Sequence, residues 1–167
     1  VSVKGKVASY NGSHDFTVTL YQAGSETMVG TPLTVSGSGA SGSTKQEFTI
    51  PNVPKGTYDL VVTKDAHLTY TVKNVVVGST DLDLTTLTGK PYSTITLLCG
   101  DIDGNGFINS TDLGIILKGQ NYGKSTATAG DKAADLDGNG FINSTDLGIV
   151  LQGQHYGKSA VSVNFGG

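Results

Sequence analysis

Residues 1–98 alternate apolar and polar side chains over short runs, which is the pattern of half-buried β-strands. The alternation is clearest in Phe16–Leu20 and Tyr58–Val62, and turn residues such as Asn11-Gly12 separate the runs. The expected strands are Val3–Ala8, Phe16–Tyr21, Glu47–Ile50, Thr57–Thr63 and Leu68–Val77. Short strands at this spacing predict a small antiparallel β-sandwich.

After residue 100 the apolar positions follow a helical spacing instead. Ser110–Lys118 places Leu113, Ile116 and Leu117 on one face, and the pattern returns in Ser144–Gln152. We interpret this apolar stripe as core. Hydroxyl side chains at the start of each segment are expected to cap the helix. Glycines inside both segments weaken a helix and indicate close approach by another backbone.

The two helical segments belong to a tandem duplication. Asp101–Ser125 and Asp135–Ser159 align with an offset of 34 residues, and only four of 25 aligned positions differ. The differing pairs are Ile102/Leu136, Ile116/Val150, Lys118/Gln152 and Asn121/His155. Of these, Lys118/Gln152 and Asn121/His155 change the chemistry of the side chain most.

Each copy opens with oxygen-bearing side chains at loop positions 1, 3, 5 and 12 and a glycine at position 6, the spacing of an EF-hand calcium loop. Position 7 contributes a carbonyl, and position 9 acts directly or through water. The predicted ligands are Asp101, Asp103, Asn105, Phe107, Asn109 and Asp112 in the first loop, and Asp135, Asp137, Asn139, Phe141, Asn143 and Asp146 in the second. A single Asp-Gly-Asn-Gly run is equally compatible with a tight turn, but two complete ligand sets favour calcium.

Several consequences follow for this region. Six of its seven aspartates are predicted ligands, so without a cation the carboxylates repel one another. We therefore expect two Ca²⁺ ions and a repeat region that is substantially unfolded when calcium is removed. At position 8, Ile108 and Ile142 are expected to face inward and to pair between the two loops.

Composition excludes several other functions. The chain has 167 residues, a formal charge of −3 and no arginine, which makes nucleic-acid binding unfavourable. Its only glutamates are Glu26 and Glu47, and no other acid pair is placed for glycoside hydrolysis, so we expect no enzyme.

The single Cys99 is expected to be a small buried residue. Tyrosines of the sandwich leave open a calcium-stabilised carbohydrate-binding domain. These are Tyr10, Tyr21, Tyr58 and Tyr70.

The duplicated loops, each followed by one helix, resemble the dockerin family over about Gly100–Ser159. Upstream, Phe48–Leu60 and Val72–Val77 resemble the X modules, Ig-like or carboxypeptidase-regulatory-like sandwiches that precede type II dockerins. The resemblance implies a fold of β + α class, an N-terminal β-sandwich followed by an all-α dockerin with two calcium loop–helix repeats. It also implies a one-to-one complex with a cohesin, type II favoured, that attaches a cellulosome scaffoldin to a cell-surface anchoring protein. A type I-like docking tail of a cellulosomal enzyme or subunit is the alternative, because Ser-Thr at loop positions 10 and 11 resembles type I dockerins.

In this family the partner contacts the two helices, beginning at loop positions 10 and 11. By resemblance the candidates are Ser110, Thr111, Leu117, Lys118, Tyr122, Ser144, Thr145, Leu151, Gln152 and Tyr156. Because the copies are nearly identical, a rotation of 180° presents nearly the same surface, and two binding orientations are expected. Lys118 against Gln152 then offers a means of selecting one orientation.

We expect two domains, the sandwich at 1–92 and the dockerin with its tail at 93–167. The tail Ala160–Phe165 alternates, and it either folds back near Tyr92–Leu98 or is disordered. The sequence has no stretch long enough to span a bilayer, and it begins at Val1 without a methionine or signal peptide, which indicates a processed or excised piece. The resemblance and a need for calcium favour an extracellular, cell-surface-associated protein.

Overall fold

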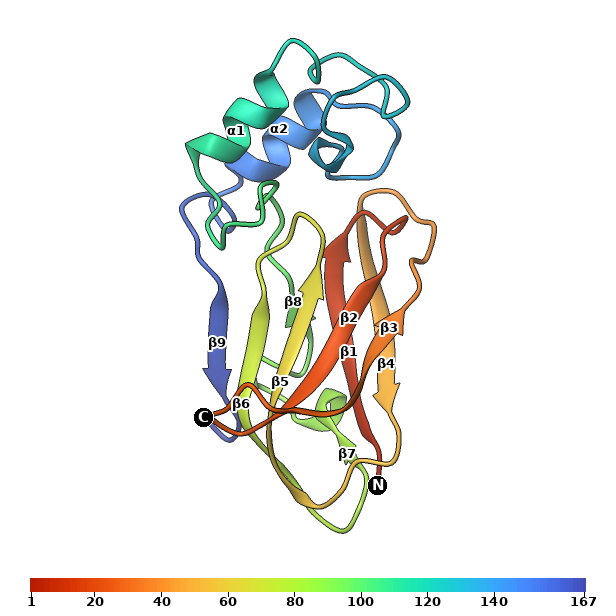
Figure 1. The fold of residues 1–167 in the computed structure, drawn as a ribbon, viewed down its shortest axis with the longest axis vertical. Helices are drawn as coiled ribbons and strands as arrows, with labels where there is room; N and C mark the ends of the chain where they lie inside the picture. Colours follow the sequence, from red (N-terminus) through yellow and green to blue (C-terminus); the bar gives the residue numbers. More distant parts are fainter.

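A computed structural model describes residues 1–167 and consists of two β-sheets with a pair of helices beyond one end (Figure 1). The strands are β1 (Val3–Tyr10), β2 (Phe16–Gln22), β3 (Met28–Val35), β4 (Ser43–Ile50), β5 (Gly56–Lys64), β6 (Tyr70–Val77), β7 (Leu82–Asp83), β8 (Ile95–Thr96) and β9 (Val161–Asn164). The helices are α1 (Ser110–Leu117) and α2 (Ser144–Leu151), with single 3₁₀ turns at Leu84–Thr86 and Lys132–Ala134.

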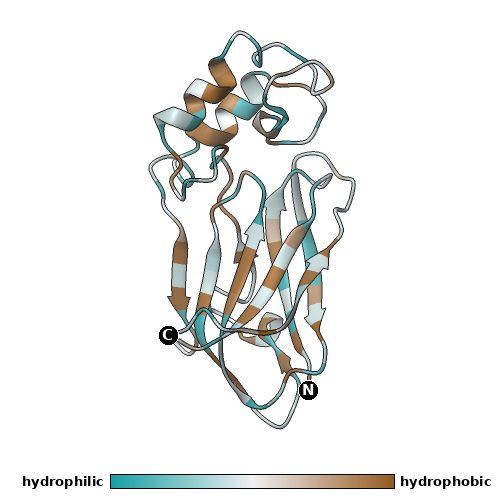
Figure 2. Cartoon of the chain, viewed as in Figure 1, coloured by the Kyte–Doolittle hydropathy of each residue, from teal (hydrophilic) through white to brown (hydrophobic).

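The two sheets pack face to face as a sandwich. One has the order β4-β1-β7, with β8 also pairing with β1, and the other has the order β3-β2-β5-β6-β9. Strand β1 shows how the alternation of apolar and polar residues corresponds to burial: Val3 and Val7 are buried while their neighbours are half-exposed. Hydrophobic and hydrophilic bands accordingly alternate along the strands in Figure 2. Burial of one face of each sheet forms an 18-residue core.

Both sheets extend beyond the strands that the sequence predicted. Strand β3 was not predicted, because it lies at the edge of its sheet and most of its side chains are exposed. Strand β4 begins at Ser43, four residues before its predicted start, by pairing along the whole of β1. Antiparallel pairing therefore sets the length of this strand. Its polar first half has no alternation of apolar residues from which a strand could be predicted.

Residues on both sides of the repeats complete the sandwich. Beyond the predicted division at 92/93, β8 pairs in parallel with β1, and Ile95 and Leu97 join the sandwich core. The tail folds back as β9, parallel to β6. Its Phe165 ring stacks on Tyr92 with centroids 5.4 Å apart, and Gly166 N–H donates to the Tyr92 hydroxyl at 2.8 Å. The chain thus leaves the sandwich from the sheet of β1, forms the repeats and returns to the edge of the other sheet.

The repeats form a second, smaller core. Nine buried residues make it, including Ile108, Ile116 and Ile142 from the repeats, Cys99 from the connection, and Leu68 from the sandwich. The prediction of an all-α second unit is only partly confirmed, because each helix has eight residues and isolated β-bridges tie the loops. None of the helices is long and apolar enough to cross a membrane.

Candidate metal loops and helix faces

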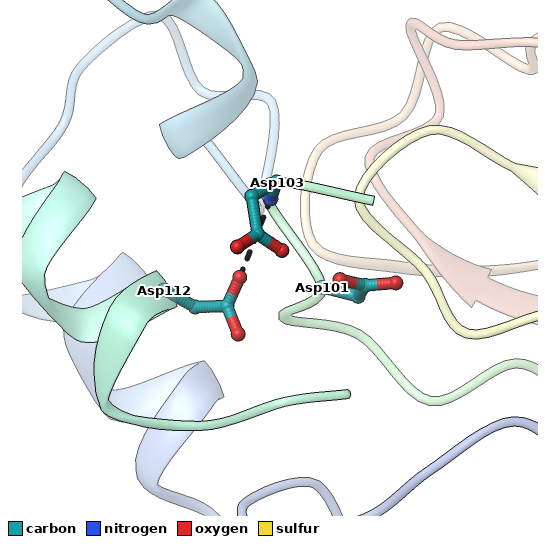
Figure 3. A group of neighbouring side chains, drawn as sticks. All are labelled: Asp101, Asp103 and Asp112. Carbon is teal, nitrogen blue, oxygen red and sulfur yellow. Dashed lines mark hydrogen bonds between the residues drawn. The ribbon is translucent and has the colours of Figure 1, made fainter. Parts of the chain in front are cut away.

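In the first loop, three carboxylates from separate loop positions converge (Figure 3). The oxygens of Asp101, Asp103 and Asp112 lie within 4.8 Å of one another. Asp101 accepts from Asn105 N–H at 3.1 Å and Gly106 N–H at 3.0 Å, so the loop wraps around this carboxylate. A cluster of hard oxygen atoms is a group that could hold a metal ion, and its chemistry fits Ca²⁺.

The second loop repeats the geometry with Asp135, Asp137 and Asp146, again within 4.8 Å. The helix-start carboxylate Asp146 accepts from Leu136 N–H and Asn143 N–H, both at 2.8 Å. All three second-loop carboxylates are buried, whereas Asp103 of the first loop is exposed. The two loops therefore share their ligand chemistry but differ in their surroundings.

Burial makes these carboxylates unfavourable without a cation. It raises the pKa of Asp101, Asp112 and Asp146, and it raises the pKa of Asp135 to about 6. Neighbouring carboxylates add to the rise in pKa, while the loop N–H groups oppose it. A divalent cation between the oxygens would replace the proton, which is what a calcium loop requires.

The remaining predicted ligands divide into two kinds. Asn105 and Asn139 each accept from the N–H two residues later, at 3.0 and 2.9 Å, which bends the loop around the cluster. The carbonyls of Phe107 and Phe141 accept no hydrogen bond within the chain, so both stay available to an ion.

The position-9 asparagines cap the helices. Asn109 accepts from Thr111 N–H at 3.0 Å and Asn143 from Thr145 N–H at 2.9 Å, and Asp112 and Asp146 complete capping boxes. The predicted capping by the hydroxyl residues is thus wrong, because the helix starts one residue after the asparagine. The hydroxyl residues are left exposed at the surface; they are Ser110, Thr111, Ser144 and Thr145.

Ile108 and Ile142 face inward as predicted and belong to one buried cluster, but no backbone hydrogen bond pairs them. Both are buried, but Ile108 exchanges backbone hydrogen bonds with the segment after α2, at Gly157 and Lys158. Ile142 does the same with Gly123 and Lys124, after α1. Each loop is therefore bound to the end of the other repeat, which makes the two copies one interlocked unit.

The apolar stripe of each helix is only partly core. Ile116 and Val150 are buried, whereas Leu117 and Leu151 are 55% and 52% exposed. Tyr122, Tyr156 and Lys118 are exposed beside them, and Gln152 is half-buried. The two copies thus present matched leucine–tyrosine pairs that the interpretation as core did not anticipate.

The helical glycines are open to solvent. Gly114 and Gly148 lie within the helices, and Gly119 and Gly153 follow the helix ends; all four are exposed, and an added Cβ would meet no atom of another segment within 4 Å. The expected approach by another backbone is therefore absent within this chain. The exposed side chains of Phe107 and Phe141 were also missed as surface features, because the loop pattern assigned these residues by their carbonyls alone.

Asn121 and His155, the most different pair of the repeat, are both buried. Asn121 Nδ2 donates to Ile115 O at 2.6 Å, and His155 Nδ1 lies 2.7 Å from Ile149 O, so the two side chains serve equivalent carbonyls. This pair therefore adds no asymmetry to the exposed surface. Of the positions at which the two repeats differ, Lys118/Gln152 is therefore the one that changes the chemistry of the exposed surface.

Other predicted features of the sandwich give no binding platform. Tyr58 and Tyr70 are buried, and Tyr10 and Tyr21 are half-buried, so none of the four is fully exposed for sugar stacking. Cys99 is buried, and burial raises the pKa of its thiol, as expected for an unreactive residue.

Comparison with known proteins gives a family for the repeats and a fold for the whole chain. Residues 99–152 match the family model of the dockerin type I domain. A solved N-terminal interface mutant of a type II cohesin–X–dockerin complex from Acetivibrio cellulolyticus is similar, with a TM-score of 0.65 and 25% identity over 96% of this chain and 97% of that one. A C-terminal interface mutant from the same organism gives 0.64 and 24% over the same shares. No curated protein matches the chain.

A β-sandwich joined to two interlocked loop–helix repeats is the architecture of an X module followed by a dockerin. The family match identifies a dockerin domain at residues 99–152, and the structural likeness shows that the whole chain has the fold of an X module–dockerin pair. The resemblance stated from the sequence is thereby confirmed.

Proposed function

We propose that the chain is a calcium-dependent anchoring module whose dockerin binds one cohesin domain and attaches a cellulosome scaffoldin to a cell-surface anchoring protein. The observation that carries the proposal is the duplicated site: two carboxylate clusters, each followed by a helix with an exposed leucine and tyrosine. We place the protein outside the cell, where calcium is abundant.

Calcium supports the partner face through the helix starts. Asp112 belongs to the first carboxylate cluster, and its second oxygen accepts from Asn109 N–H at the start of α1. Asp146 plays the same part for α2. An ion that draws these carboxylates inward would fix where each helix begins, and hence where Leu117 and Leu151 are presented.

The proposed partner-binding residues form two similar surfaces. The exposed hydroxyl residues mark the helix starts, and the leucines and tyrosines follow toward the helix ends. Since the marked exposed difference is Lys118 against Gln152, a cohesin can meet either copy with nearly the same contacts. We therefore propose two binding orientations, biased by any cohesin carboxylate that lies near Lys118.

The sandwich favours a type II cohesin as the partner. The solved complexes with this fold are type II cohesin–X–dockerin complexes, and they match over nearly the whole chain. A type I cohesin is the second candidate, because the repeats match the dockerin type I family model. In that case the chain would be the docking tail of a cellulosomal enzyme or subunit.

Calorimetric titration against one type I and one type II cohesin, each with calcium and with chelator, tests the proposal. We expect one-to-one binding to the type II cohesin that needs calcium. Binding to type I alone would assign the second candidate, and binding that survives excess chelator would contradict the role of the loops. Val76→Ala is a matched control for substitutions on the helices, because Val76 is 57% exposed on the sandwich.

A further inference from the structure

The sandwich hydrogen-bonds to carbonyls inside the second carboxylate loop, whereas it holds the first loop only at its start, where Gly100 N–H donates to Ala66 O at 2.8 Å. Asn11 Nδ2 donates to the carbonyl of Asp135 at 3.0 Å in a buried hydrogen bond, and Gly42 N–H donates to the carbonyl of Asp137 at 2.7 Å. No group of the sandwich donates to the carbonyls of Asp101 or Asp103. The two loops have the same types of predicted ligand residue, so they differ in their contacts with the sandwich and not in their ligand chemistry.

The rim that makes these contacts is itself tied together. Asn11 N–H donates to Gly42 O at 3.1 Å, and Gly12 N–H donates to Ala40 O at 2.8 Å. Asn11 has a φ of 58°, a left-handed conformation that asparagine tolerates better than most residues. The two donors therefore approach the loop from one cross-linked support and not from two independent loops.

The fit between rim and loop is close. A Cβ added at Gly138 would clash with the Asn11 side chain, whereas one added at Gly104, the equivalent position of the first loop, would meet nothing within 4 Å. Asp137 is only 7% exposed, while its counterpart Asp103 is exposed. The rim thus both restrains the second loop and removes water from one of its carboxylates.

We infer that Asn11 is a positioning residue for the second metal loop, and that it makes two sites of identical ligand chemistry unequal in calcium affinity. The inference rests on the proposed calcium binding. Hydrogen bonds that form as the second loop folds around its ion add to the free energy of binding, and a carboxylate shielded from water attracts the ion more strongly. The second loop fills first, and by reciprocity its ion tightens the contact with the sandwich.

The expected difference is about fivefold in calcium concentration, the equivalent of one net hydrogen bond. Gly106 N–H and Gly140 N–H donate to Asp101 and Asp135, at 3.0 and 2.9 Å, so their amide resonances report each site separately. In a calcium titration of the full chain followed by NMR, we expect Gly140 to shift at lower free calcium than Gly106.

Asn11→Gly removes the donor while suiting the positive φ, and it should raise the Gly140 midpoint about fivefold without moving the Gly106 midpoint. Asn11→Asp keeps the oxygen that accepts from Ser13 N–H and should act in the same direction. Asn52→Gly is the matched control, because Asn52 has a φ of 56° and is exposed on the sandwich.

Three results would overturn the inference. The midpoints could be equal in the unsubstituted chain, Asn11→Gly could leave the Gly140 midpoint unchanged, or it could move both midpoints by the same factor. A chain in which neither glycine responds to calcium would overturn the proposed function as well. These failures are distinguishable, because the first three still show two calcium sites.

Discussion

The exposed leucines of the two helices allow a test of binding in two orientations. Leu117 and Leu151 are 55% and 52% exposed, so a partner that covers one of them buries about half of a leucine side chain. At about 1.5–3 kcal/mol for a complete leucine, that half contributes about 1 kcal/mol, or about fivefold in affinity. Each Leu→Ala substitution therefore weakens the orientation that uses it by about fivefold.

The single and double variants then give different losses. If both orientations are equally populated, Leu117→Ala leaves the other one intact, and the observed affinity falls by less than about twofold. Leu151→Ala behaves alike, while the double variant weakens both orientations and loses about fivefold. Calorimetry against the same cohesin measures the affinity of the unsubstituted chain, the two single variants and the double variant, with Val76→Ala as the control. A single variant that loses as much affinity as the double would refute the reasoning, since it would assign binding to one helix.

Three further predictions concern calcium, orientation and pH. In excess chelator the far-ultraviolet circular dichroism of the helices should disappear and return with calcium; retained helix would contradict the coupling of metal binding to folding. Exchanging Lys118 and Gln152 should change the ratio of the two orientations, measured by relaxation from a spin label on the cohesin, and an unchanged ratio would exclude selection by this lysine. Burial lowers the pKa of His67 to about 4, so its neutral ring stabilises the fold fully above about pH 6.5, and this contribution is lost as the pH falls toward 4. The His67→Asn variant should therefore lose less thermal stability between pH 7 and pH 5 than the unsubstituted chain, and an equal loss in both would exclude His67 as the source.

The geometry around His67 explains the sign of its pKa change. Its Nε2 accepts from Tyr10 N–H at 3.0 Å, and its Nδ1 lies 2.7 Å from Asp65 O. The neutral ring with its proton on Nδ1 satisfies both bonds. A second proton on Nε2 would face the Tyr10 N–H group, so protonation costs a hydrogen bond as well as the burial of a charge.

Local patterns predicted which carboxylates converge and where the helices lie. The carboxylates that converge are those chosen from the loop spacing, and the helices end one residue before their predicted ends. The asparagine caps were missed although the signal was present: Asn109 and Asp112, three residues apart, form a capping box. Local features of this kind are encoded within a few residues.

Long-range features could not be read in the same way. The exchange of Ile108 and Ile142 between repeats depends on how the two copies pack, which no single copy specifies. Strands β7 and β8 have two residues each, too few for any alternation to be recognised. The contact of Asn11 with the second loop joins residues 124 positions apart, and near-identical repeats gave no indication of which copy the sandwich would touch.

The central claim is that the two carboxylate clusters hold calcium and that this assembles the helix faces. Calorimetric titration of calcium into the chelator-stripped full chain, with circular dichroism recorded at each point, tests it most directly. We predict two ions per chain and a helical signal that grows with their binding. A chain that binds no calcium, or that binds it without any change in helical signal, would contradict this account.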